Sequence, residues 1–224
     1  MALFHLILTR KNRKMSEQSL KEQWQERLKN WKTNLEELQV QFHLGRKEAE
    51  EKLEEQKKSV RQWMDEAGER LQEIGEEASE EAQELKVAIE KLREKLNRGP
   101  AQTKEEHQQQ EDELSASIED LQAKAEAVEE KADAKTAGMM EDLSFRMGQF
   151  QAQLKVLSAK LKEESAEEWS EFREEAKEKL DALKKKTDVW AAEANKEWGE
   201  IRGELKKTFG QIMNTLNKDK KGQE

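Results

Sequence analysis

The sequence predicts an all-α protein built from long amphipathic helices, and three observations carry this prediction. Charged residues make up 41% of the 224 residues and hydrophobic residues only 34%, a balance typical of long helices and coiled coils. Apolar residues recur every three or four positions along most of the chain, which is the spacing of one helix face. The sequence has a single proline, so helical hydrogen bonding meets few obligatory interruptions.

The apolar stripe advances by about 3.6 residues per step, not by the 3.5 of a heptad repeat. Intervals of eleven residues, which correspond to three helical turns, separate Trp31, Phe42, Leu53 and Met64. We therefore expect nearly straight helices, packed as antiparallel hairpins or as an elongated helical bundle or coiled coil. Two uninterrupted rods of roughly 120 Å are the alternative, at a rise of about 1.5 Å per residue.

The strongest helix break lies at Gly99 and Pro100. Glycine suits the left-handed position after a helix, and proline cannot continue the helical hydrogen bonding. We expect residues 16–98 to form a first helical unit, residues 99–113 a turn and polar linker, and residues 114–217 a second helical unit. Residues 1–15 are predicted to be a disordered extension, with a natural start at Met15, and residues 218–224 a disordered tail.

The two units resemble each other in the order and spacing of their apolar residues. At an offset of 119, the matching residues are Trp31, Leu35, Leu38 and Phe42 with Phe150, Leu154, Leu157 and Leu161. At an offset of 116, they are Ala78, Ala82, Leu85, Ile89 and Leu96 with Ala194, Trp198, Ile201, Leu205 and Ile212. An internal duplication is our interpretation, although any two amphipathic helices can be aligned on their stripes. If each unit is a hairpin, the turns lie near Gly75 and near Thr187-Asp188, where Asp188 would cap the next helix. Weaker candidate breaks are His43-Leu44-Gly45 and Thr136-Ala137-Gly138.

The stretch from Trp169 to Leu216 is the candidate interaction or packing face. Its defining residues are Trp169, Phe172, Leu183, Trp190, Trp198, Ile201, Leu205, Phe209, Ile212 and Leu216. All six tryptophans of the chain fall on or beside such stripes. We favour a core role for them, because a helix can bury a flat ring against a neighbouring helix. An aromatic surface for lipid, ligand or a partner protein is the alternative.

No catalytic, cofactor-binding or metal site is predicted. The absence of cysteine excludes disulfides, thiolate metal sites and thiol nucleophiles. The three histidines, His5, His43 and His107, have no partners at metal-ligand spacing. A net charge of −9 disfavours nucleic acid as a partner. We therefore expect no enzyme and no small-molecule substrate, and a partner that is a second copy or another helical protein.

A membrane surface is the second candidate partner. The apolar stretch Met1–Leu8 is far too short to span a bilayer, and it lacks the features of a signal peptide. We therefore expect a cytoplasmic protein. The stretch Leu205–Lys221 places five lysines beside apolar residues, a pattern typical of helices that lie on membranes. The same lysines would also complement the dipole at a helix end.

The segment Trp198-Gly-Glu-Ile201-Arg-Gly-Glu-Leu205-Lys-Lys-Thr-Phe209-Gly-Gln-Ile212 resembles a bacterial family of small coiled-coil stress-response proteins. The likeness extends best over Phe150–Ile212 and less well over Trp31–Leu96, where Ala82 and Arg93 stand in place of aromatic residues. It implies no enzymatic activity, no cofactor and no catalytic residue. We thus expect a non-enzymatic helical protein that acts through helix–helix contacts in a stress-associated, structural or scaffolding role. Reversible lipid-surface binding, as in apolipoprotein-like helices, is the alternative.

Overall fold

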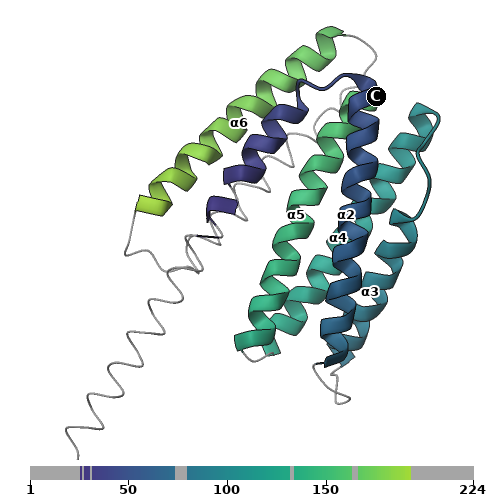
Figure 1. Ribbon diagram of the computed structural model, residues 1–224, viewed down its shortest axis with the longest axis vertical. Coiled ribbons are helices and arrows are strands. Elements are labelled where there is room, and N and C mark those ends of the chain that lie inside the picture. Colours follow the sequence, from purple (N-terminus) through teal and green to yellow (C-terminus); the bar gives the residue numbers. More distant parts are fainter. Residues whose placement is uncertain are drawn as a thin grey trace, which may run out of the picture. The chain divides into compact units, whose positions relative to one another are not determined.

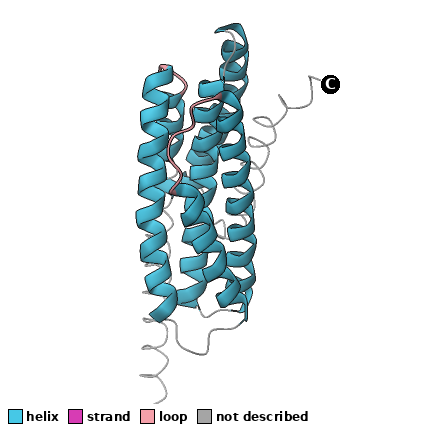
Figure 2. Cartoon of the chain, turned by 90° about the vertical axis from the view of Figure 1, so that its right-hand side faces the viewer, coloured by secondary structure: helices cyan, strands magenta, loops and turns pink. Residues whose placement is uncertain are grey.

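The computed structural model describes residues 26, 28–30, 32–73, 80–131, 134–162 and 166–192. Within these ranges the backbone consists of helices and short connections without a strand, which confirms the all-α prediction (Figure 2). The helices are α2 (Arg46–Glu73), α3 (Glu80–Leu96), α4 (Lys104–Lys131), α5 (Ala134–Lys162) and α6 (Ala166–Ala192) (Figure 1). Residues 32–41 are also helical. The longest of the five helices, α5, has 29 residues, so the described part of the chain does not form uninterrupted rods.

The chain divides into two compact units that differ from the units expected from the sequence. Residues Val40–Glu171 form one, which we call the four-helix unit. The other, which we call the helix-pair unit, has its described residues at 26, 28–30, 32–39 and 172–192. The four-helix unit continues across Pro100, because α3 and α4 on its two sides pack against each other. The reversal at Pro100 therefore joins two neighbours within one unit.

In the four-helix unit, α2, α3, α4 and α5 pack in a ring in which each helix contacts two others. Helices α3 and α4 are antiparallel, as contacts near both ends of α3 show. Near its start, Glu81 pairs with Lys131 at the end of α4, and near its end, Lys95 donates to Ser117 at 2.7 Å. Short connections between antiparallel neighbours are characteristic of an up-and-down helix bundle.

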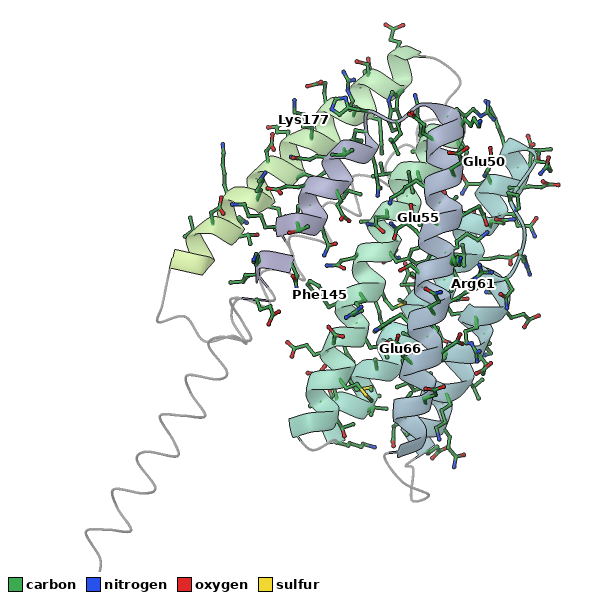
Figure 3. The ribbon with its side chains drawn as sticks, viewed as in Figure 1. Glu50, Glu55, Arg61, Glu66, Phe145 and Lys177 are labelled. Atoms are coloured by element: carbon green, nitrogen blue, oxygen red, sulfur yellow. The ribbon has the colours of Figure 1, made fainter. Side chains whose placement is uncertain are left out.

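The apolar stripes of these helices meet in one continuous core. On α2 the predicted stripe residues Leu53, Val60, Met64, Ala67 and Leu71 are buried. Opposite them on α3, α4 and α5, six residues are at most 1% exposed: Leu85, Leu92, Ile118, Leu121, Leu143 and Met147. Burial of a large aliphatic side chain stabilises a fold by about 1.5–3 kcal/mol. Most charged residues lie on the exposed faces, as Glu55 and Glu66 of α2 do (Figure 3).

Gly99 and Pro100 lie in the connection between Leu96, where α3 ends, and Lys104, where α4 begins. Residues 104–113, which the sequence assigned to a polar linker, are helical. A capping box explains this early start. The Thr103 Oγ1 atom accepts from the Glu106 backbone N–H at 3.1 Å, and the Glu106 carboxylate accepts from the Thr103 N–H at 3.3 Å.

Helix α6 runs without a break through Thr187 and Asp188, so the turn and the Asp188 cap predicted there are wrong. The Thr187 side chain is buried, and its hydroxyl donates to the Leu183 carbonyl oxygen at 2.9 Å, one turn earlier in the helix. Helix α5 likewise includes residues 136–138, whereas residues 42–45 do interrupt the helical backbone. The other predicted turn, near Gly75, lies outside the described residues.

In the helix-pair unit, residues 32–39 lie antiparallel to α6. Three polar contacts fix this register along the pair. Lys32 binds Asp188 at 2.8 Å, Lys184 binds Glu36 at 2.9 Å, and the Gln39 amide donates to Asp181 at 2.6 Å.

Candidate functional site

The structure places three side chains of the predicted packing face. Trp169 is 8% exposed, Leu183 is fully buried, and Phe172 is half-buried. Trp190 lies in α6, but its side chain is outside the described residues. The remaining predicted residues are also outside them: Trp198, Ile201, Leu205, Phe209, Ile212 and Leu216.

Trp169 is held on two sides within the four-helix unit. Its ring centroid lies 6.2 Å from that of Phe42, with the two planes tilted by 47°. The Nζ atom of Lys160 lies 4.7 Å from the same centroid, a distance at which the ammonium group is attracted to the ring face. These contacts give Trp169 the core role that was expected for the tryptophans.

The candidate site of the molecule is a layer of buried and half-buried polar residues at one end of the four-helix unit. We call it the polar layer, and it consists of His107, Gln108 and Glu111 of α4 with Lys162 of α5. His107 is 7% exposed and Glu111 is 5% exposed. Lys162 Nζ donates to the Glu111 carboxylate and, at 2.8 Å, to the Gln108 side-chain oxygen. The layer therefore joins the start of α4 to the end of α5 through charge-assisted hydrogen bonds.

Burial governs the protonation of His107. Removal of the imidazole from water lowers its pKa below the ordinary 6.5, and the positive charges of Arg46 and Lys162 lower it further. The carboxylates of Glu50 and Glu106 act in the opposite direction. The net pKa shift is downward, so the folded protein favours the neutral imidazole.

Some buried amide atoms near this end have no hydrogen-bond partner. The Gln108 Nε2 atom has none, although its carbonyl oxygen accepts from Lys162. Gln41 is 2% exposed, and neither of its side-chain amide atoms has a partner. Buried groups that are left unpaired destabilise a fold by about 1–3 kcal/mol each. Ser115 of α4 and Ser144 and Gln149 of α5 also have a buried side-chain atom without a partner, so unpaired polar groups occur along these helices and not only at this end.

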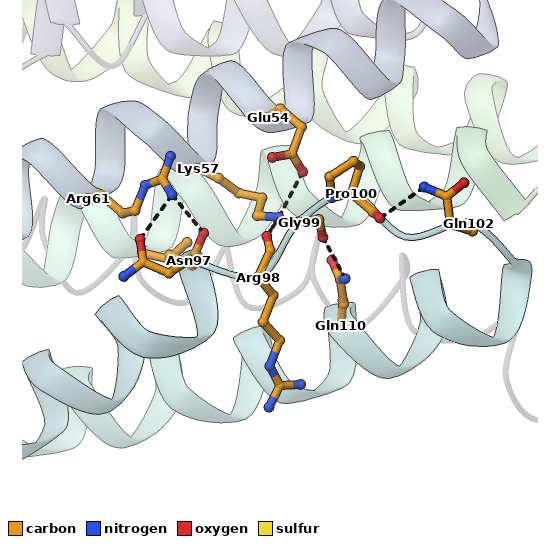
Figure 4. Close-up of polar contacts among 10 residues, drawn as sticks. Glu54, Lys57, Arg61, Asn97, Arg98, Gly99, Pro100, Gln102 and Gln110 are labelled. Carbon is orange, nitrogen blue, oxygen red and sulfur yellow. Dashed lines mark hydrogen bonds and ion pairs between the residues drawn. The ribbon is translucent and has the colours of Figure 1, made fainter.

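Lys57 is a further charged residue that is buried in the four-helix unit. It lies on the apolar face of α2 and is 1% exposed. Its Nζ atom donates to Glu54 at 2.7 Å and to the Arg98 carbonyl oxygen at 2.8 Å (Figure 4). Arg61, one turn along α2, donates to Asn97 Oδ1 at 3.0 Å. These two cations of α2 thus hold the polypeptide that leaves α3.

A small cleft lies between α2 and α5 near the opposite end of the unit. It is lined by Trp63, Glu66, Ala67, Leu71, Met139, Met140, Asp142 and Leu143. Its volume is about 20 Å³, room for roughly one water molecule. The guanidinium group of Arg146 lies 5.0 Å from the Trp63 ring centroid and pairs with Asp142 at 3.0 Å. Trp63, like Trp169, is therefore packed against neighbouring helices of its own unit.

Lys57 and Glu111 were not among the residues predicted from the sequence, and His107 was expected only to lack partners at metal-ligand spacing. Their spacing contained the signal. Lys57 continues the buried stripe between Leu53 and Val60, and His107 and Glu111 extend the stripe of α4 toward its start. The spacing of apolar residues thus predicts burial at all three positions, if polar residues are allowed to occupy the stripe.

The described residues contain no group of three or more His, Cys, Asp or Glu side chains placed to hold a metal ion. None of the described helices is long and apolar enough to cross a membrane. No protein-family model matches the chain, and no curated protein or solved structure matches it either.

Proposed function

We propose that this chain is a non-enzymatic cytoplasmic protein that acts through helix–helix contacts in a structural or scaffolding role. The observation that carries the proposal is the burial of α5. Residues 151–158 are all buried. Leu154 and Leu157 belong to the core of the four-helix unit, and Ala152 and Val156, which are not part of that core, are buried as well. A helix that buries more than one apolar stripe is typical of the interior of a helical assembly.

The polar groups inside the four-helix unit support the same proposal. Lys57 and Arg61 bind backbone or side-chain oxygens at the end of α3, and Lys162 binds Glu111 across two helices. These groups position helices relative to one another. The stress-associated role rests on the resemblance of the Trp198–Ile212 segment, and the partner we propose is a second copy or another helical protein.

The test is self-association measured on the full chain. Sedimentation equilibrium over a wide dilution series gives the mass, and cross-linking of mixed light and heavy isotope-labelled chains identifies contacts between copies. We expect either a mass that rises with concentration or, at constant mass, specific cross-links to a helical protein in cells. A constant monomer mass, with no intermolecular cross-links either between purified chains or in cells, would contradict the proposal.

Reversible lipid-surface binding is the second candidate. It is supported by the apolar stripes with their period of about 3.6 residues and by the stretch Leu205–Lys221, which places five lysines beside apolar residues. A helix with such a face can lie on a lipid surface with its apolar residues in the bilayer. Anionic vesicles should then shift tryptophan emission to shorter wavelength and bind the chain in flotation. Unchanged emission and no co-flotation would exclude this candidate.

A further inference from the structure

The polar layer lies where three helices of the four-helix unit meet at one end. Helices α2 and α4 begin there, at Arg46 and Lys104, and α5 ends there at Lys162. The charged groups that act on His107 come from all three helices: Arg46 and Glu50 of α2, Glu106 of α4, and Lys162 of α5. Glu111, one turn further along α4, has its carboxylate bound to Lys162.

Protonation of His107 is unfavourable in the polar layer. The imidazole is buried, and two cations, Arg46 and Lys162, already act on it. The Lys162 ammonium is bound to Glu111 and Gln108, so its position is fixed by the contacts that join α4 to α5. An imidazolium can regain water if the first two turns of α4, which include Gln108 and Glu111, move away from α2 and α5. Such movement breaks the contacts that Lys162 makes.

We propose that the polar layer is an acid-sensitive latch, in which protonation of His107 loosens the end of the four-helix unit where α2 and α4 begin and α5 ends. The inference concerns this unit alone and does not rest on the proposed function. Loosening there exposes the apolar residues next to the layer, Leu114 of α4 and Leu157 and Leu161 of α5, which are almost fully buried when the latch is closed.

The direction of the pH dependence follows from the lowered pKa of His107. Between that lowered pKa and the ordinary 6.5, the unfolded chain binds a proton that the folded chain does not. The contribution of His107 to stability is therefore complete above pH 6.5 and is lost as the pH falls through the folded-state pKa. Within this window the folded-to-unfolded ratio falls by up to about tenfold per pH unit.

The test compares urea unfolding of the full chain from pH 8 to pH 5 in three proteins. They are the wild type, His107→Gln, and the matched control His43→Gln, since His43 is exposed. We expect the wild type and His43→Gln to lose stability together below pH 6.5. His107→Gln should lose less stability, and its folded-to-unfolded ratio should fall by up to about tenfold less per pH unit than that of the wild type. The loss that remains in His107→Gln comes from carboxylates that all three proteins share. Equal losses in all three proteins would overturn the proposal.

Two measurements on the wild type keep the proposal testable even if His107→Gln fails to fold. An NMR titration gives the pKa of the His107 imidazole, and we expect a value below the ordinary 6.5. Hydrogen exchange, corrected for the intrinsic effect of pH, should show acid-induced opening confined to the starts of α2 and α4 and the end of α5. A His107 pKa at or above 6.5, or exchange that rises uniformly over all four helices, would overturn the latch.

Discussion

The Lys57 ammonium group donates a hydrogen bond to the Arg98 carbonyl oxygen at 2.8 Å, although 41 positions separate the two residues. Through this bond α2 anchors the connection between α3 and α4. The lysine side chain is 1% exposed, so its aliphatic stem also fills a position of the apolar stripe. Its two roles, packing and anchoring, can be separated by substitution.

The variant Lys57→Met tests the anchoring role. Methionine fills the same stripe position, while Glu54 and the exposed Arg98 regain water as partners. Only Lys57 is replaced, but the Glu54 side chain is 35% exposed, so its carboxylate is not left as an uncompensated buried charge. We expect the free energy of unfolding to change by less than about 1 kcal/mol, with faster tryptic cleavage after Arg98 because the connection has lost its anchor. Unchanged cleavage would show that Lys57 does not hold the connection.

The variant Lys57→Ala tests the packing role. Alanine removes the bonds and also leaves a cavity where the buried stem lay. We expect a loss of at least about 2 kcal/mol in urea unfolding relative to Lys57→Met. Equal stability of the two variants would mean that the stem contributes little to the core.

The assignment of buried and exposed faces can be tested on α3. Leu92 is 0% exposed, whereas Val87 on the same helix is 54% exposed. Leu92→Ala should lower the free energy of unfolding by about 2–5 kcal/mol, because it removes buried apolar contacts and leaves a cavity. Val87→Ala should change it by less than about 0.5 kcal/mol. Chemical denaturation of both variants checks the difference, and comparable losses would contradict the assigned faces of α3.

The start of α4 depends on Thr103. Thr103→Ala removes the oxygen that accepts from the Glu106 backbone N–H, and we expect a loss of about 1 kcal/mol in urea unfolding. Glu106→Gln should lose less, because glutamine can also complete a capping box. If Thr103→Ala is as stable as the wild type, the capping box does not determine where α4 begins.

The continuity of α6 is tested by Thr187→Pro. Proline inside a helix removes a hydrogen bond and clashes with the preceding turn, at a cost of about 3 kcal/mol or more. We expect lower helicity by circular dichroism and a lower melting temperature. Thr187→Ser retains the hydroxyl that bonds to Leu183 and serves as the control. A proline variant with wild-type helicity would instead support the turn at Thr187-Asp188 that the sequence suggested.

Much of the helix packing could be predicted from the spacing of apolar residues alone. Leu53, Met64 and Leu71 are buried on one face of α2, as the 3.6-residue period requires. The breaks were harder to predict. Asp188 looked like a helix cap, but in the structure its carboxylate pairs with Lys32, a residue 156 positions away. Local preferences for capping cannot reveal a partner that distant.

The candidate site was hidden for a related reason. His107 and Glu111 are polar, and an exposed helix face is the ordinary place for such residues. The buried carboxylate of Glu111 is paired with Lys162, which lies more than 50 positions later in the chain. The predicted duplication stays a prediction, because Ala194, Trp198, Ile201, Leu205 and Ile212 of its second block lie outside the described residues.

The sequence by itself determined that this chain is helical and which faces of its helices are apolar, because helix periodicity is a local property of the backbone. The tertiary structure decided which helices became neighbours, where Pro100 falls within a unit, and which polar residues are buried. Those outcomes depend on pairs of residues far apart in the chain, such as Lys57 with Arg98 and Glu111 with Lys162. A charged side chain can be buried only where folding brings it a partner, and a local pattern does not contain that partner.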